Sequence, residues 1–197
     1  MDYGVGNLAN VERALRRAGA PGIRITADGR TLLASRALVL PGVGNFGHCA
    51  RELAARGLEA PVRKARAEGI PILGLCVGMQ LFFEQSEEDP SANGLGFLRG
   101  TVRRLRGAVR VPHIGWNEVR LRRAHPWLVA VPEGAHFYFV HSYAPESAGD
   151  AVIATTDHGE AFASIVGADG LLGVQFHPEK SSHMGTRLLE GFVRGIS

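Results

Sequence analysis

The sequence has little of several features that would mark a specialised class of protein. Its 197 residues include two cysteines, Cys49 and Cys76, which are too few for a disulfide framework and do not form a C-x-x-C pair. No apolar run approaches the ~20 residues of a membrane-spanning helix, and residues 1–4 lack the basic and apolar regions of a signal peptide. We therefore expect reduced thiols in a cytoplasmic protein.

The sequence also lacks a strong excess of charge of one sign. There are 22 lysines and arginines against 19 acidic residues, a formal net charge of +3. The paired arginines at 16–17, 103–104 and 122–123 are separated along the chain, which favours solvated faces over a nucleic-acid surface. The eight histidines are scattered, and none pairs with a cysteine or glutamate at metal-ligand spacing. We expect no nucleic-acid partner, no metal and no cofactor.

Apolar segments of two different periods alternate along the first part of the chain. They predict two buried strands at 37–40 and 70–75, and helices at 8–18, 49–56, 60–67 and 77–83. Asn7 stands where the N-cap of the first helix belongs. Continuous apolar strands separated by helices indicate a parallel sheet covered on both faces. The fold class predicted is α/β, a doubly wound, mostly parallel sheet.

The pattern changes after about residue 96. Strand-like segments then follow one another at 100–105, 117–121, 136–141, 152–156, 162–166 and 172–176. They predict an antiparallel region added to the parallel sheet, and a final amphipathic helix follows near residues 188–193. There is no internal repeat and no low-complexity linker, so residues 1–197 are predicted to form a single domain.

The start of the chain departs from this pattern. A doubly wound fold normally opens with a complete buried strand, whereas only three residues precede the turn at 4–7. This leaves two alternatives open. Either the first strand is a stub, or the chain as recorded starts inside a longer one.

One cysteine lies in a nucleophile-like setting. Gly74-Leu75-Cys76-Val77-Gly78 has the form G-x-C-x-G between a predicted strand and a predicted helix, the thiol counterpart of the G-x-S-x-G elbow. Such a turn lifts the thiol above the sheet, and a helix N-terminus favours the thiolate. The Val77 N–H would face a developing oxyanion. The alternative is that Cys76 is a small core residue, as we interpret Cys49.

A base and its orienting group are available near the end of the chain. His177-Pro178-Glu179 follows the last predicted strand, where sites gather in sheets of this kind. A thiol nucleophile needs a base with a pKa near neutrality, and a carboxylate can fix the tautomer of that base. The alternative interpretation of these three residues by themselves is a surface turn.

Taken together, these segments resemble the class I (triad) glutamine amidotransferases, and the resemblance covers essentially the whole chain. Six segments carry it, at residues 2–8 (DYGVGNL), 40–47 (LPGVGNFG), 74–80 (GLCVGMQ), 112–117 (PHIGWN), 139–143 (FVHSY) and 175–181 (QFHPEKS). The resemblance narrows to the branch that serves histidine biosynthesis. It implies an enzyme that hydrolyses L-glutamine to glutamate and ammonia.

The resemblance also assigns roles to residues. Cys76 would attack the carboxamide and form a glutamyl thioester, His177 would shuttle protons, and Glu179 would orient His177. The oxyanion would be held by backbone N–H groups at Val43, Gly44 and Val77. Glutamine would be bound by Gln80, Glu88, Ser142 and Tyr143. Gln80 could instead be a helix-surface amide, and Glu88 part of a solvated acidic run.

A partner follows from the chemistry of ammonia. Near pH 7 free ammonia is mostly ammonium, which has no lone pair, so a useful donor passes its product directly to an acceptor site. The resemblance implies a (β/α)8 cyclase that makes imidazole glycerol phosphate and an aminoimidazole carboxamide ribotide, in a heterodimer with this chain. Asn7, Trp116 and Lys180 match positions at or near that interface. Alternatively they are an N-cap, a core-edge aromatic and a surface lysine.

Other activities remain possible on the sequence alone. The glutaminase subunit of pyridoxal phosphate synthase also has a Cys-His-Glu triad, but its oxyanion loop typically reads P-G-G-E-S, where this chain has Pro41-Gly42-Val43-Gly44. DJ-1/PfpI-like cysteine enzymes usually place histidine directly after the cysteine, where Val77 stands here. A catalytically silent interaction subunit is the alternative from a different class, and the intact triad argues against it.

Overall fold

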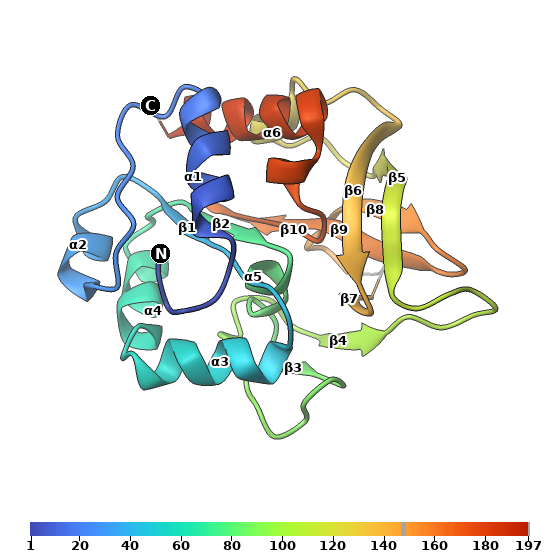
Figure 1. Ribbon diagram of the computed structural model, residues 1–197, viewed down its shortest axis with the longest axis horizontal. Helices are drawn as coiled ribbons and strands as arrows, with labels where there is room; N and C mark the ends of the chain where they lie inside the picture. The colour runs from blue at the N-terminus through green and yellow to red at the C-terminus, as the bar shows by residue number, and fades with distance from the viewer. Residues whose placement is uncertain (147–148, 197) are drawn as a thin grey trace.

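A computed structural model describes residues 1–146 and 149–196, and its centre is a seven-stranded mixed sheet with helices on both faces (Figure 1). Its strands, in spatial order, are β1 (Leu38–Leu40), β2 (Ile72–Leu75), β10 (Leu171–Val174), β9 (Ala161–Ala168), β8 (Val152–Asp157), β5 (His113–Leu121) and β6 (Ala135–His141). β1, β2 and β10 pair in parallel, and the remaining neighbours pair antiparallel. The predicted α/β fold with an added antiparallel region is confirmed. The sheet is not mostly parallel, however, because β9, β8, β5 and β6 join it through antiparallel pairings.

A smaller sheet lies beside the main one. It contains β3 (Gln85–Ser86), β4 (Thr101–Arg104) and β7 (Tyr143–Pro145), in that order. Only Ser142 separates β6 in the main sheet from β7 in the small sheet. The chain therefore passes from one sheet to the other at Ser142.

Helices cover the main sheet on both sides. They are α1 (Leu8–Arg17), α2 (Gly29–Leu33), α3 (Phe46–Ala55), α4 (Glu59–Ala67), α5 (Val77–Gln80) and α6 (Ser182–Gly195), with short 3-10 helices η1 (Pro126–Leu128) and η2 (Pro178–Lys180). Figure 1 shows α1 and α6 on one face of the sheet and α3 and α4 on the other. The predicted N-cap of α1 is confirmed, since the Asn7 side chain accepts a hydrogen bond from Asn10 N.

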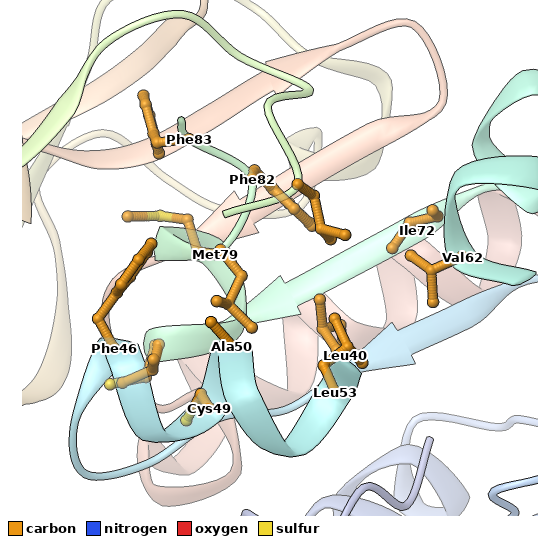
Figure 2. Close-up of a cluster of buried hydrophobic side chains, with 14 of the residues drawn as sticks. Leu40, Phe46, Cys49, Ala50, Leu53, Val62, Ile72, Met79, Phe82 and Phe83 are labelled. Carbon is orange, nitrogen blue, oxygen red and sulfur yellow. The ribbon is translucent and has the colours of Figure 1, made fainter. Parts of the chain in front are cut away.

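Two groups of buried apolar side chains correspond to these two faces. One contains Leu40, Phe46 and Leu53 and joins α3 and α4 to the sheet; Figure 2 shows these side chains with Ile72 and Met79 from β2 and α5. The other joins α1, α6 and η1 to the opposite face and includes Leu15 and Phe192. The parallel strands β2 and β10 are therefore buried on both sides, as their apolar sequences predict.

The predicted helix at 77–83 is wrong in its length, because α5 ends at Gln80. The backbone carbonyls of Leu81, Phe82 and Phe83 accept hydrogen bonds from the loop at 95–98 instead of from a further helical turn. A tertiary contact thus replaces the local hydrogen bonds that would extend the helix. Several strand bounds also differ from the predicted ones. For example, β10 ends at Val174, β5 begins at His113 and β9 extends to Ala168.

The first residues lie alongside β1. The Met1 ammonium donates to Val39 O at 2.9 Å, and Asp2 N donates to Thr26 O at 2.8 Å. Burial lowers the pKa of the Met1 amine to about 6. Within the described residues, no helix is long and apolar enough to cross a membrane.

Candidate active site

The site forms where three neighbouring parallel strands end. β1 leads into the loop at 41–44, β2 leads into Cys76, and β10 leads through two residues to His177. Because β1, β2 and β10 are adjacent and parallel, their carboxyl ends meet at one edge of the sheet. The topology therefore brings Cys76 together with a loop about 35 residues before it and with His177 about 100 residues after it in the sequence.

Cys76 occupies a strained backbone conformation. Its φ of 52° and ψ of −114° lie in a region that residues with a side chain rarely adopt. The turn packs closely, because a methyl group on Gly78 would overlap the Leu40 carbonyl oxygen. Cys76 N donates to Val174 O at 2.8 Å, which fixes the elbow against β10. The side chain is almost fully buried and lines a cavity.

His177 and Glu179 form a buried hydrogen-bonded pair. His177 Nδ1 lies 2.7 Å from Glu179 Oε1, and their side chains are 5% and 3% exposed. Glu179 lies in the single turn η2, so a turn rather than an extended segment brings the two groups together. His177 N donates to Tyr138 O at 2.9 Å, and Ser181 Oγ donates to His177 O at 2.6 Å. The imidazole is therefore held from several sides.

The surroundings of His177 favour its charged form. Burial lowers the pKa, but hydrogen bonds with Cys76 and Glu179, together with their negative charge, outweigh burial and raise the pKa to about 10. Because Nδ1 is used by Glu179, Nε2 is the ring nitrogen left for Cys76. The arrangement suits a cysteine that acts as thiolate next to an imidazolium.

The predicted oxyanion groups lie beside Cys76. Val77 N donates to Gly42 O at 3.3 Å, a long hydrogen bond that occupies this N–H. Gly44 has a φ of +84°, which favours glycine there. The Cys49 thiol donates to Val43 O at 3.4 Å. The loop at 41–44 is therefore tied down on both sides, by the elbow and by α3.

A cavity of about 370 Å³ opens above these groups, a volume that fits a small substrate. Ten of the thirteen predicted site residues line it: Val43, Gly44, Cys76, Val77, Gln80, Glu88, Ser142, Tyr143, His177 and Lys180. Pro112, Val140 and His141 complete the lining. The other three predicted residues do not line the cavity: Glu179 contacts His177, and Asn7 and Trp116 lie elsewhere.

The predicted substrate residues have differing surroundings. The Gln80 amide is 2% exposed, and its Nε2 donates to Tyr143 O at 2.9 Å and to Gln175 Oε1 at 3.0 Å. Glu88 Oε2 accepts from Phe46 N at 2.7 Å, at the start of α3. Gln80 is thus a buried amide rather than a helix-surface one. Glu88 is a half-buried carboxylate that reaches the cavity.

The three predicted interface residues lie on elements that contact one another. Lys180 Nζ is 5.9 Å from the centre of the Tyr138 ring, and Tyr138 packs edge-on against Trp116. Trp116 is 53% exposed, so it is not buried in the core edge. Helix α1, which Asn7 caps, contacts η2, where Lys180 lies. Asn7, Lys180 and Trp116 therefore belong to neighbouring elements.

Sequence reasoning missed two groups beside the site. Gln175 is fully buried, and its Nε2 lies 3.7 Å from Cys76 Sγ. His141 lines the cavity and donates from Nδ1 to Tyr143 O at 3.0 Å. Burial lowers the pKa of His141 to about 3. The sequence does contain a signal for Gln175, because it is a polar residue that directly follows an apolar strand.

A second groove, of about 430 Å³, lies between α1, β1 and α6. Its lining is mostly apolar and includes no cysteine or histidine. No group of three or more histidine, cysteine or acidic side chains could hold a metal ion within residues 1–146 and 149–196. The cavity at Cys76 is therefore the one that combines a nucleophile with a base.

Comparison with known proteins agrees with this geometry. The chain matches the family Glutamine amidotransferase class-I over residues 1–196. It belongs to that family, which confirms the resemblance carried by the six segments. A crystal structure titled as a glutamine amidotransferase has the same fold, with a TM-score of 0.75 and 21% identity over 98% of this chain and 94% of that one.

The similarity to one kind of subunit is much higher. The imidazole glycerol phosphate synthase subunit HisH of Thermococcus kodakarensis is 46% identical over 98% of this chain and 97% of that protein. The same subunit of Symbiobacterium thermophilum is 45% identical over 100% of this chain and 92% of that protein. The chain is thus similar to HisH over nearly its whole length.

Proposed function

We propose that this chain is the glutaminase subunit of imidazole glycerol phosphate synthase. It hydrolyses L-glutamine to glutamate and ammonia, and a cyclase subunit uses the ammonia to make imidazole glycerol phosphate and aminoimidazole carboxamide ribotide in histidine biosynthesis. The observation that carries this proposal is the strained Cys76 elbow, which lines one cavity together with His177 of the buried His177–Glu179 pair. The likeness to HisH over nearly the whole chain supports the choice of partner reaction.

In the first half of the reaction, Cys76 Sγ attacks the substrate carboxamide carbon as thiolate. His177 Nε2 then gives its proton to the leaving amine, so that ammonia departs and a glutamyl thioester remains. Glu179 holds Nδ1–H and balances the imidazolium charge. In the second half, His177 takes a proton from water, and the resulting hydroxide releases glutamate.

The developing oxyanion is bound by backbone N–H groups. Val77 directly follows the nucleophile in the chain, and the hydrogen bond from its N–H to Gly42 O is long. A negatively charged oxygen is a stronger acceptor than a neutral carbonyl, so it competes well for this N–H. The N–H groups of Val43 and Gly44 supply the second donor from the facing loop.

The amino-acid end of glutamine is bound farther along the cavity. Both N–H groups of the Gln80 amide are already used, which leaves its carbonyl oxygen as the group that can accept from an ammonium. Glu88 adds a negative charge to the same cavity. Ser142 and Tyr143, at the passage between the two sheets, line the same cavity, and Tyr143 O accepts from Gln80.

The cyclase subunit binds over the surface formed by Asn7, Trp116 and Lys180, in a cytoplasmic heterodimer. Lys180 lines the cavity and also lies over the Tyr138 ring, so it connects the catalytic site with that surface. Residues 1–197 form the single amidotransferase domain of this assembly. The loop Pro41-Gly42-Val43-Gly44 favours this function over the glutaminase subunit of pyridoxal phosphate synthase.

The test is a glutamine-dependent assay on the complex with a candidate cyclase. Cys76→Ala should abolish glutaminase activity and leave folding and cyclase binding intact, because the change removes only the sulfur atom. The wild-type chain should have weak activity alone and much greater activity with the cyclase and its ribonucleotide. Glutamine hydrolysis by the Cys76→Ala complex would disprove the nucleophile assignment, and full activity without a partner would disprove the coupling.

A further inference from the structure

Gln175 is placed beside the nucleophile by the register of two strands. β2 and β10 run parallel with Leu75 opposite Val174, so the next residues, Cys76 and Gln175, lie side by side. Gln175 is 0% exposed, and its Nε2 donates to Cys76 Sγ at 3.7 Å. An amide that is fully removed from water in this position needs partners for its polar atoms.

The direction of this amide is determined by its neighbours. Tyr143 O is a carbonyl and can only accept, so the atom of Gln80 that faces it must be Nε2. The second hydrogen of that nitrogen reaches Gln175, which must therefore present Oε1 to Gln80. The Gln175 nitrogen is then left facing the sulfur, and the amide cannot be reversed without losing a buried hydrogen bond.

The Tyr143 carbonyl, which accepts from Gln80, also accepts a hydrogen bond from a second side chain. His141 Nδ1–H donates to Tyr143 O at 3.0 Å, which leaves His141 Nε2 as an acceptor. His113 Nδ1 lies 3.0 Å from that nitrogen and donates to it. His113 Nε2, 3.2 Å from Asn117 Nδ2, accepts in turn. Every donor in this series thus has a defined acceptor, from β5 to Cys76.

We propose that Gln175 is a further catalytic residue, whose amide N–H stabilises the Cys76 thiolate, and that Gln80 is a positioning residue that directs this N–H at the sulfur. The proposal rests on the proposed function, in which the Cys76 proton moves from Sγ to His177 Nε2. A hydrogen bond to a charged acceptor is about twice as strong as one to a neutral acceptor. The N–H therefore stabilises the thiolate more than the thiol. Its hydrogen bond to the sulfur becomes weaker once the sulfur has bonded to the substrate carbon and lost its negative charge.

The test measures thiolate formation directly, in the purified chain. Iodoacetamide alkylates the thiolate, which forms a thioether and releases iodide, so the alkylation rate follows the thiolate population. Cys49 interferes little, because burial raises its pKa to about 11, and Cys76→Ala supplies the background. Gln175→Met removes the N–H at nearly constant length, and Gln175→Glu keeps the acceptor toward Gln80 but has no amide donor.

A matched control lies on the adjoining strand. Gln175 N donates to Ser164 O at 2.9 Å, so Ser164 is the neighbour of Gln175 on β9. Its hydroxyl is buried and has no hydrogen-bond partner within the described residues. Ser164→Ala therefore changes the same buried layer without touching the sulfur, and it should leave alkylation unchanged.

We expect Gln175→Met to slow alkylation at pH 7 about tenfold and to move the midpoint of the pH profile upward. Gln175→Glu should slow it at least as much, and Gln80→Met should have a smaller effect in the same direction. Wild-type pH profiles in folded Gln175→Met and Gln175→Glu would overturn the proposal. If Gln175→Met does not fold, Gln175→Glu and Gln80→Met decide it, because each keeps most of the buried contacts.

Failure of this inference can be told apart from failure of the proposed function. If wild-type glutaminase activity in the cyclase complex survives complete alkylation of Cys76, the proposed function is wrong. If alkylation abolishes that activity but the Gln175 variants keep the wild-type profile, the proposed function stands and the role of Gln175 does not.

Discussion

At the scale of single residues, the surroundings of each group in the candidate site restrict its conformation and its protonation state. Cys76 keeps a backbone conformation that costs about 1–3 kcal/mol, and it does so because β10 and the Gly42 carbonyl hold the turn. Burial lowers the pKa of His177, but hydrogen bonds with Cys76 and Glu179 raise it further than burial lowers it. The sequence alone predicts a role for these residues, but it does not show how tightly each is held.

The Glu179 carboxylate should be indispensable because it fixes the tautomer of His177. In Glu179→Gln the amide can present N–H to Nδ1, which forces the ring proton to Nε2 and removes the charge that stabilises the imidazolium. We expect glutaminase activity to fall by roughly a thousandfold, with the pKa of His177 falling below its value of about 10. Glu146→Gln, in an exposed ion pair with Arg103, is the control. Activity within twofold of wild type would contradict the assignment.

Gly78 is required by close packing and not by its backbone angles. A methyl group there would overlap the carbonyl oxygen of Leu40, a backbone atom that cannot rotate away. Gly78→Ala should lower the free energy of unfolding by about 2 kcal/mol or more in urea denaturation. Gly22→Ala, where the methyl group meets nothing within 4 Å, should change it by less than about 0.5 kcal/mol. Equal effects of the two changes would contradict this explanation.

At the scale of elements, the candidate site is built where β1, β2 and β10 end together, and the proposed partner surface is built from η2, β6 and β5. Successive residues of a strand face opposite sides, so β5 turns His113 inward and Ile114 and Trp116 outward. The inward residues reach the buried hydrogen bonds beside Cys76. The outward residues are exposed at the proposed cyclase surface.

Trp116 should contribute strongly to cyclase binding. It is a large aromatic side chain that is 53% exposed and supported by Tyr138, which is typical of residues that dominate interface energies. Trp116→Ala should raise the dissociation constant of the complex about 30-fold, or about 2 kcal/mol, by isothermal titration calorimetry. Val129→Ala, another exposed apolar residue, should leave it within twofold. Unchanged binding by Trp116→Ala would remove this surface from the proposed interface.

At the scale of the whole molecule, buried neutral histidines should make the fold sensitive to acid. Burial lowers the pKa of His141 to about 3 and that of His113 to about 4, below the usual value near 6.5. The unfolded chain therefore binds these protons at a higher pH than the folded protein does. The stability that these two histidines contribute is therefore retained above about pH 6.5 and is lost as the pH falls below it.

The measurement is the free energy of unfolding between pH 6 and pH 4. His141→Gln keeps a donor for Tyr143 O but cannot take up a proton. It should therefore reduce the slope of the free energy of unfolding against pH by about 1.4 kcal/mol per pH unit. His48→Gln, at an exposed position, is the control. A slope that is unchanged in His141→Gln would mean that His141 is already charged in the folded protein.

Much of the fold could be predicted because it depends on local periodicity. The Asn7 cap, the apolar strands β1 and β2, and the amphipathic α6 follow from residues close together in the sequence. The helix at α5 was predicted too long, because the carbonyl groups of Leu81–Phe83 find partners in a distant loop. No local pattern contains that information.

The sequence by itself determined the family and predicted the cysteine at the elbow with its histidine and glutamate, because these chemical groups stand in fixed local motifs. Only the tertiary structure decided what surrounds them. Strand register places Gln175 beside Cys76, and the meeting of β6 with the small sheet brings His141 and Tyr143 to Gln80. The reason is that register and burial depend on contacts between segments distant in the chain, which set the direction of each hydrogen bond and the charge of each buried group.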